Sequence, residues 1–160
     1  MKKLIYIISI CFITQFAYAA GSDSSSDNKS DYYNDAKKLV KRAGKLEKKE
    51  KTDKAKKLYF AAFKKLEKAY SSDKSNPDIL NYMGYTSRKI GNFEQAEKFY
   101  LTGLKINPNH NGINEYLGEL YVVTNRIDLA KERLEVLKSC NCEEYQELKE
   151  IIDGSKKSKY

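Results

Sequence analysis

Several residue types are scarce in this chain of 160 residues, and their scarcity narrows its chemistry. There is no tryptophan, there are two prolines, and the only histidine is His110. So few prolines among abundant Leu, Ala, Lys and Glu favour helices over sheets. His110 has no Cys, Asp or Glu at ligand spacing and stands in a polar stretch, so we expect it in a surface loop.

The sequence also lacks the short motifs that carry catalysis. It has no glycine-rich phosphate loop, no nucleophile elbow and no cluster of metal ligands. The paired Glu143 and Glu144 stand where a helix is expected to start, and there they complement its dipole. We therefore predict no enzyme, no catalytic residue, no metal, no cofactor and no small-molecule substrate.

Long apolar runs are scarce too. The longest spans residues 4–16, about 13 residues, whereas a membrane-spanning helix needs roughly 20. It follows Lys2 and Lys3 and precedes Ala17-Tyr18-Ala19, which is typical of a cleaved signal peptide over residues 1–19. An uncleaved membrane anchor is the alternative. We expect export to a bacterial periplasm, and a disordered Ser/Asp-rich leader over residues 20–30.

Charge is unevenly distributed along the remaining chain. Residues 31–75 hold 15 basic and 7 acidic side chains, residues 76–153 hold 9 and 13, and a basic tail (153–160) comes last. The basic part is either a surface for anionic partners, such as a weak contact with anionic membranes, or a set of ordinary solvated helix faces. Export argues against nucleic acid as a partner.

Apolar residues recur at three-and-four spacing, which predicts seven helices. The first two fill residues 31–75, because Ala36, Val40 and Ala43 share one face and Ala55, Tyr59 and Ala62 share another. Four more are expected within 76–139, around breaks at Gly91-Asn92, Pro108 and Asn125. The last, near residues 143–152, is apolar on one face and acidic on the other, as a terminal cap should be.

Two successive segments in the second half of the chain repeat one pattern at a single fixed offset. Met83-Gly84 recurs as Leu117-Gly118, and four further correspondences have the same offset: Gly91 with Asn125, Phe93 with Ile127, Ala96 with Ala130, and Tyr100 with Leu134. The offset is about 34 residues and holds two amphipathic helices, which is the tetratricopeptide spacing. Asn125 also tolerates the left-handed backbone that a turn glycine would adopt.

The stretch from Leu80 to Asn109 resembles the tetratricopeptide consensus closely. It keeps Gly84, the turn glycine Gly91, Ala96, Gly103 and Pro108, while Leu80 replaces the family's tryptophan. Small residues at 84, 96 and 103 would let paired helices approach closely. The resemblance implies an all-α right-handed superhelix of antiparallel pairs: two repeats plus a cap over 76–152, after a degenerate pair over 31–75.

Cys140 and Cys142 are the two cysteines beyond the signal segment, and three states remain open for them. They could form a structural disulfide in an oxidising compartment, remain free or packed thiols, or serve a redox or metal role. The turn resembles one in secreted proteobacterial tetratricopeptide proteins that end in C-x-x-x-C-E-E. The spacer here is shorter, so a bridge is not assured by the resemblance.

The family resemblance implies that the first helix of each repeat lines a concave groove. We expect an exposed stripe there, formed in one repeat by Asn81, Tyr85, Arg88 and Lys89 and in the next by Glu115, Glu119, Val122 and Val123. A groove with one cationic and one acidic wall suits an extended peptide or a partner helix. The function we predict is an adaptor or assembly factor that binds a protein or peptide. The alternatives are solvated residues without a partner, a subunit of a periplasmic complex, or a membrane-surface protein recruited by its lysine-rich helices.

Overall fold

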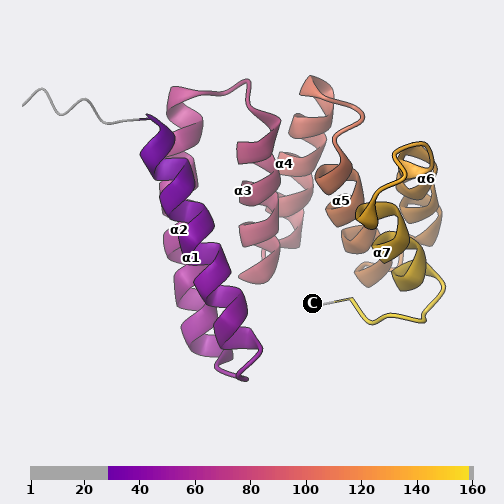
Figure 1. Cartoon of the computed structure of the whole chain (residues 1–160), viewed down its shortest axis with the longest axis horizontal. Helices are drawn as coiled ribbons and strands as arrows, with labels where there is room; N and C mark the ends of the chain where they lie inside the picture. Colours follow the sequence, from indigo (N-terminus) through magenta and orange to yellow (C-terminus); the bar gives the residue numbers. More distant parts are fainter. Residues whose placement is uncertain (1–28, 159–160) are drawn as a thin grey trace, which may run out of the picture.

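The computed structural model describes residues 29–158, and within them every regular element is an α-helix (Figure 1). The helices are α1 (Lys29–Glu47), α2 (Thr52–Ser72), α3 (Pro77–Lys89), α4 (Phe93–Ile106), α5 (Asn111–Val123), α6 (Ile127–Leu137) and α7 (Glu143–Ile152). The predicted all-α class is confirmed. The predicted signal peptide and residues 20–28 of the leader lie outside the described residues, and the last two residues of the predicted leader, 29 and 30, belong to α1. None of the described helices combines the length and apolarity that crossing a bilayer requires.

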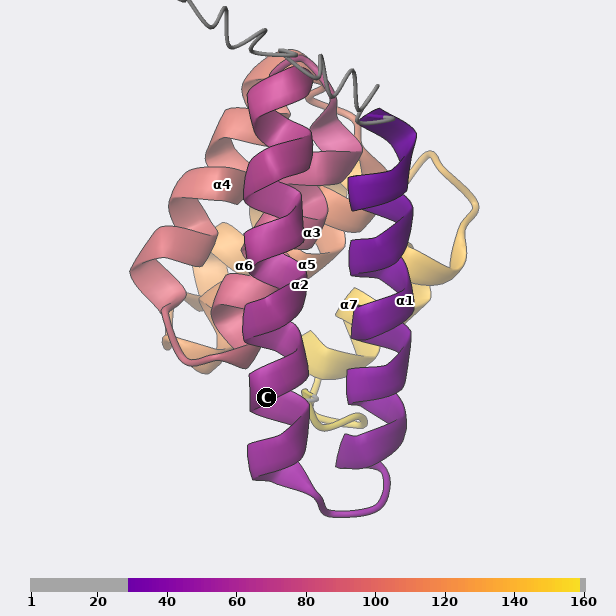
Figure 2. The same ribbon diagram turned by 90° about the vertical axis from the view of Figure 1, so that its left-hand side faces the viewer.

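The helices pack as successive pairs along one axis. α1 packs on α2, α3 on α4 and α5 on α6, and α7 covers the last pair through contacts with α5 and α6. The first helices α1, α3 and α5 also touch one another in order, so they form one continuous side of the stack. α1 and α2 have 19 and 21 residues, against 11 to 14 in α3 to α6, and their hairpin extends past its neighbours (Figure 2).

Glycines mark the closest approaches between helices. A Cβ at Gly84 would overlap the Tyr100 ring, which confirms that α3 and α4 need a small residue there. A Cβ at Gly103 would instead meet Ile113 of the next pair, and one at Gly118 would meet Leu148 of α7. Of these three glycines, only Gly84 allows close packing within its own helix pair. Gly103 and Gly118 instead allow close packing against later helices of the chain, α5 and α7 respectively.

The turns between paired helices keep the left-handed backbone that the repeat requires. Gly91 has a φ of 94°, and Asn125, its counterpart one period later, has a φ of 59°. The prediction that Asn125 takes over the role of the turn glycine is confirmed. Asparagine is one of the few side chains that adopt this conformation at low cost.

His110 is the N-cap of α5 and is more than a surface-loop residue. Its Nδ1 accepts a hydrogen bond from the Ile113 backbone N–H at 3.2 Å, and its Nε2 lies 3.0 Å from Asp78 Oδ1 in α3. An N-cap must accept from one of the first free N–H groups of its helix, and the ring does so here. The single histidine thus joins the starts of two successive first helices.

Cys140 and Cys142 form a disulfide at the turn into α7. Their Cα atoms lie 5.2 Å apart, with Asn141 between them at a φ of 48°. Beyond α7 the described part of the tail turns back toward α5, where Ser158 Oγ lies 3.2 Å from Glu119 Oε2. The tail is therefore packed against the fold as far as the structure describes it.

Candidate functional site

The stripe predicted on α3 lies on the side formed by the first helices, but its charged members are not exposed. Arg88 is only 2% exposed. It donates to the Tyr116 backbone carbonyl from NH1 at 2.7 Å, and its NH2 lies 3.3 Å from Glu119 Oε2. The expectation of separate cationic and acidic walls is wrong, because α5 packs so close to α3 that the opposite charges pair and leave solvent.

Lys89 is also buried in an ion pair, in its case with α1 rather than α5. Its ammonium lies 2.8 Å from Glu47 Oε1 at the end of α1, and Glu47 also accepts a hydrogen bond from the Tyr59 hydroxyl at 2.9 Å. This ion pair joins α1 to α3, while the tyrosine adds α2. Arg88 and Lys89 thus hold successive pairs together.

The stripe predicted on α5 is largely buried as well. Glu115 and Glu119 are 5% and 3% exposed, and Val122 packs against the core cluster of α4, α5 and α6, whereas Val123 is exposed. Burial first, then a hydrogen bond with Glu147 and the nearby carboxyl groups, raise the pKa of Glu115 to about 9. Glu115 is therefore protonated at neutral pH. The loss of exposure follows from α7 and the tail, which pack beside α5.

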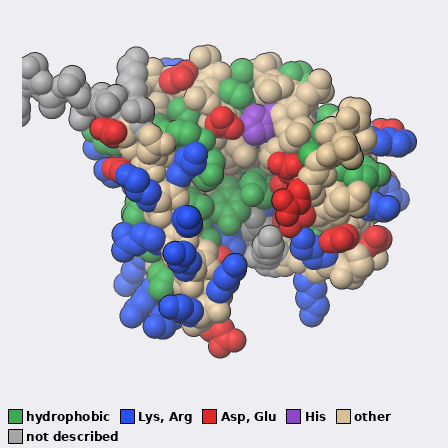
Figure 3. Space-filling model, in the orientation of Figure 1, with side chains coloured by type: hydrophobic (Ala, Val, Ile, Leu, Met, Phe, Trp, Pro, Cys, Tyr) green, Lys and Arg blue, Asp and Glu red, His purple; other side chains and the backbone are tan. Residues whose placement is uncertain are grey.

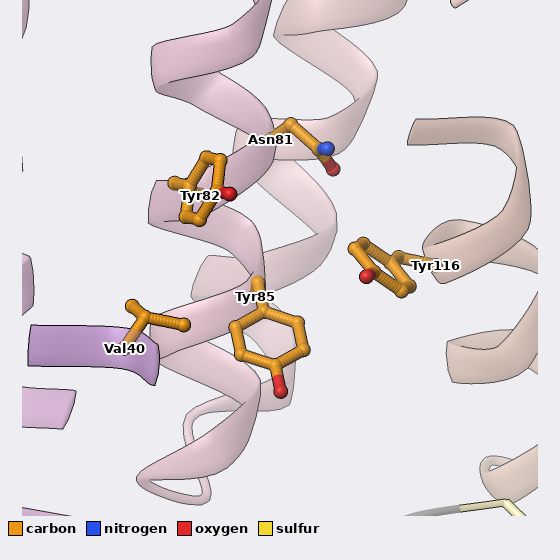
Figure 4. A pocket seen from close by; sticks show the side chains of 5 residues that line it. All are labelled: Val40, Asn81, Tyr82, Tyr85 and Tyr116. Carbon is orange, nitrogen blue, oxygen red and sulfur yellow. The ribbon is translucent and has the colours of Figure 1, made fainter. Parts of the chain in front are cut away.

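A hollow of about 160 Å³ opens between α1, α3 and α5 (Figure 4). We call it the tyrosine hollow; it is lined by Val40, Asn81, Tyr82, Tyr85 and Tyr116. Tyr116 faces α3 across the hollow, and the Asn81 amide points toward the same space (Figure 4). Asn81 and Tyr85 are the members of the predicted stripe that the structure places on this lining.

Tyrosines from four helices pack against one another around the hollow, in a group of three and a separate pair. The ring centres of Tyr59 and Tyr85 lie 5.9 Å apart, and those of Tyr85 and Tyr116 lie 5.2 Å apart. Nearer α1, Tyr33 meets Tyr82 edge-on at 5.7 Å. Burial raises the pKa of Tyr85 and of Tyr116, so both hydroxyls stay neutral at physiological pH. The surface offers broad apolar area with neutral hydroxyls, which is what tyrosine contributes to interfaces.

Asn81, which lines the hollow, has one side-chain atom without a hydrogen-bond partner in the described structure. Asn81 is only 9% exposed, and the atom without a partner among the described residues is its carbonyl oxygen, Oδ1. A buried carbonyl oxygen without a donor costs about 1–3 kcal/mol, so native structures rarely keep one without a reason. A ligand N–H in the hollow would satisfy it.

One helix pair, the one that contains Asn81, matches a known protein family. Residues 77–110, which form α3, α4 and the turn after them, match the model described as tetratricopeptide repeat. The chain carries a tetratricopeptide repeat. The resemblance inferred from Gly84, Gly91, Ala96 and Pro108 is thereby confirmed over that segment. No curated protein matches the chain.

Solved tetratricopeptide domains share this fold over more than three quarters of the chain. The second such domain of human RPAP3, in complex with the HSP70 peptide SGPTIEEVD, aligns with a TM-score of 0.52 at 16% identity, covering 78% of this chain and 98% of that one. The Arabidopsis OM64 domain gives 0.51 at 12% identity, covering 78% and 99%. The Yersinia enterocolitica type III secretion chaperone SycD, in complex with a peptide of the translocator YopD, gives 0.50 at 15% identity, covering 76% and 88%. At these identities the likeness establishes the fold.

Sequence reasoning missed part of the lining, although the tetratricopeptide period contained a signal for it. Tyr82 and Tyr116 are separated by one full period, so they hold the same position in successive repeats. Matching aromatics at one repeat position would have placed both on the same face. Val40 carried no comparable signal, because the pair it belongs to follows the repeat only loosely.

Proposed function

We propose that this chain is an exported protein-interaction module that binds an extended segment of a partner protein in the tyrosine hollow. The observation that carries the proposal is the buried, unpaired Asn81 carbonyl oxygen on the wall of a cavity framed by three tyrosines. A backbone N–H of an extended segment supplies the missing donor, and an apolar side chain of that segment fills the space between the rings. Such a module would act as an adaptor or an assembly factor in the cell envelope.

Support also comes from the solved tetratricopeptide domains, of which two are complexes with peptides. The hollow in this chain lies between α1, α3 and α5, the first helices of successive pairs. Its volume of about 160 Å³ is the size of one large side chain rather than of a cofactor, which needs a pocket of about 300–1,000 Å³.

The test is site-specific photocrosslinking in the producing cell. A benzoylphenylalanine at position 82 should crosslink to a discrete partner, and the crosslink should disappear when Tyr116 is changed to Ala. The same photoreactive residue in place of Leu101, which is 42% exposed on α4, is the control and should give no such product. Equal crosslinking from both positions, or no loss with Tyr116→Ala, would count against the hollow as the site.

Export is part of the proposal and is tested separately. The charged start, short apolar run and Ala17-Tyr18-Ala19 of the sequence support cleavage after residue 19. N-terminal sequencing of the protein recovered from the periplasmic fraction should begin at Ala20. A chain that begins at Met1 and stays with membranes would support the anchored alternative.

A membrane-surface role is a second candidate, favoured by the protruding end of the α1–α2 hairpin. Nine of its exposed cations form no ion pair among the described residues: Lys41, Arg42, Lys45, Lys48, Lys49, Lys51, Lys54, Lys56 and Lys57. Each basic residue near an anionic surface contributes about 1 kcal/mol at low salt. Co-sedimentation with vesicles of phosphatidylglycerol should therefore be lost in high salt, whereas vesicles of phosphatidylcholine should not bind.

A further inference from the structure

A second pocket adjoins the tyrosine hollow and shares a wall with it. We call it the acidic pocket; it measures about 290 Å³ and is lined by Glu115, Tyr116, Glu143, Glu144 and Glu147. Tyr116 lines both pockets, so the two lie on either side of one residue of α5. A single extended segment that passes over Tyr116 reaches both. Figure 3 shows carboxylates gathered beside the apolar hollow in the region of α5 and α7.

The acidic pocket carries an excess of negative charge. Glu143 and Glu144, in the first turn of α7, form no ion pair among the residues described here. Glu147 pairs with Lys156, and Glu119 pairs with Arg88. Two carboxylates on the wall are thus left without a neutralising side chain.

The chain's own tail shows which group this wall accepts. The Lys156 ammonium lies 2.7 Å from Glu147 Oε1 and 3.9 Å from Glu150 Oε2. The carboxylate oxygens of Glu115, Glu119 and Glu147 lie within 4.8 Å of one another, which is a spacing that could hold a metal ion. Arg88 and Lys156 already neutralise Glu119 and Glu147, and Glu115 is protonated at neutral pH, so these three groups leave no net charge to hold a metal ion.

The geometry points to a basic segment as the ligand: an apolar or aromatic side chain enters the tyrosine hollow, and a lysine or arginine of the same segment enters the acidic pocket. This inference rests on the proposed function and adds the charge of the partner. Asn81 Oδ1 then accepts from the backbone of the segment, and the Tyr116 ring lies beside the cation. The preference is opposite in sign to the acidic end of the peptide SGPTIEEVD in the human RPAP3 complex.

The test uses labelled peptides and the purified full chain. The probes are fluorescein-labelled glycine/serine peptides that contain one Tyr and one Lys, at several spacings, and the same peptides with Gln or Glu in place of Lys. Fluorescence anisotropy at low salt should show binding about tenfold tighter for Lys than for Glu at the best spacing, a difference of about 1.4 kcal/mol. Peptides with Gln should lie between them.

A charge-matched pair of variants locates the effect. Glu143→Gln with Glu144→Gln should reduce the preference for Lys over Glu several-fold while the affinity for the Tyr/Gln peptide is unchanged. The control is Glu132→Gln with Glu135→Gln, which removes the same charge from exposed positions on α6 and should keep the preference. All four residues are on the surface or partly exposed, so the fold should tolerate both changes.

Three outcomes decide between the proposals. Equal or tighter binding of the Glu peptides, with binding still lost when the peptide Tyr is replaced by Ser, overturns the basic specificity and leaves the proposed function standing. A preference for Lys that both double variants reduce equally reflects overall charge and overturns the acidic pocket as its source. Binding by none of the peptides, at any spacing, counts against the hollow and the acidic pocket together.

Discussion

Helices α3 and α5 occupy equivalent places in successive repeats, yet they differ most at their facing surfaces. Positions that pack into the core agree, as Gly84 with Gly118 and Met83 with Leu117. Positions that face the neighbouring repeat do not, because Arg88 corresponds to Val122 and Glu119 to Tyr85. The differences are complementary rather than random, since Arg88 of one helix pairs with Glu119 of the other. The residues that differ between the two repeats are therefore the ones that join them.

The largest expected effect comes from breaking that interface. Arg88→Met leaves Glu119 buried without its guanidinium, and removing one partner of a buried ion pair typically costs about 3–5 kcal/mol. The double variant Arg88→Met with Glu119→Gln should recover part of the loss. Urea unfolding followed by far-ultraviolet circular dichroism measures both. The control is Arg126→Met, whose pair with Glu97 is more exposed and should cost about 1 kcal/mol or less.

Gly84 and Gly118 hold the same position in the two repeats, yet replacing each with alanine should reduce stability by different amounts. Gly84→Ala places a methyl group against the Tyr100 ring, which is fully buried, and should destabilise by about 1–3 kcal/mol. Gly118→Ala meets the end of the Leu148 side chain, which has more freedom to shift, and should cost less. Thermal unfolding of the two variants gives the comparison. A larger loss at Gly118 would mean that the cap helix α7 is the more rigid neighbour.

Glu115 stands where the earlier repeat has Asn81, and the difference makes stability depend on pH. Its pKa is raised to about 9 in the folded chain, against an ordinary value of 4.5. Between those values the folded chain keeps a proton that the unfolded chain releases, so the free energy of unfolding falls as pH rises. Glu115→Gln removes this titration. From about pH 5 to about pH 9, the wild type should lose at least about 1.4 kcal/mol relative to the variant in urea unfolding, which corresponds to one pKa unit. A constant difference between the two across that range would contradict the raised pKa.

The smallest effect is expected at the turn that ends each repeat. Pro108 closes one repeat, and Cys142 holds the corresponding position one period later. The disulfide with Cys140 encloses only a very short loop, so replacing both cysteines with serine should cost at most about 1.5 kcal/mol. Pro108→Ala should cost about 0.4–1 kcal/mol, because it only frees the unfolded backbone. Calorimetry of both variants tests whether the two turns are energetically equivalent.

The architecture could be predicted from the sequence because helix period, turn residues and the repeat offset all depend on local chemistry. Gly91 and Asn125 identified both turns, and the apolar spacing located all seven helices within the part of the chain that the structure describes. The exposure of Arg88, Lys89 and Glu119 could not be read in the same way. It depends on how closely neighbouring pairs approach, and a helix pattern specifies which face a residue occupies but not what packs against that face.

The same limit explains why the acidic pocket could not be predicted from the sequence. Glu143 and Glu144 were accounted for locally, as charges that complement the start of α7. Their meeting with Glu115 and Tyr116 depends on the docking of α7 against α5, which joins residues far apart in the sequence. Long-range pairing of this kind has no signature in a single sequence.

The Arg88 contacts also bear on how the stack unfolds. In repeat proteins, stability is approximately the sum of intrinsic terms for each repeat and coupling terms between nearest neighbours. Arg88 contributes to the coupling term twice, through the Tyr116 carbonyl and through Glu119. A strong coupling term raises the free energy of any state in which one repeat is folded and its neighbour is not. The two repeats that Arg88 joins, α3–α4 and α5–α6, should consequently melt as one cooperative unit.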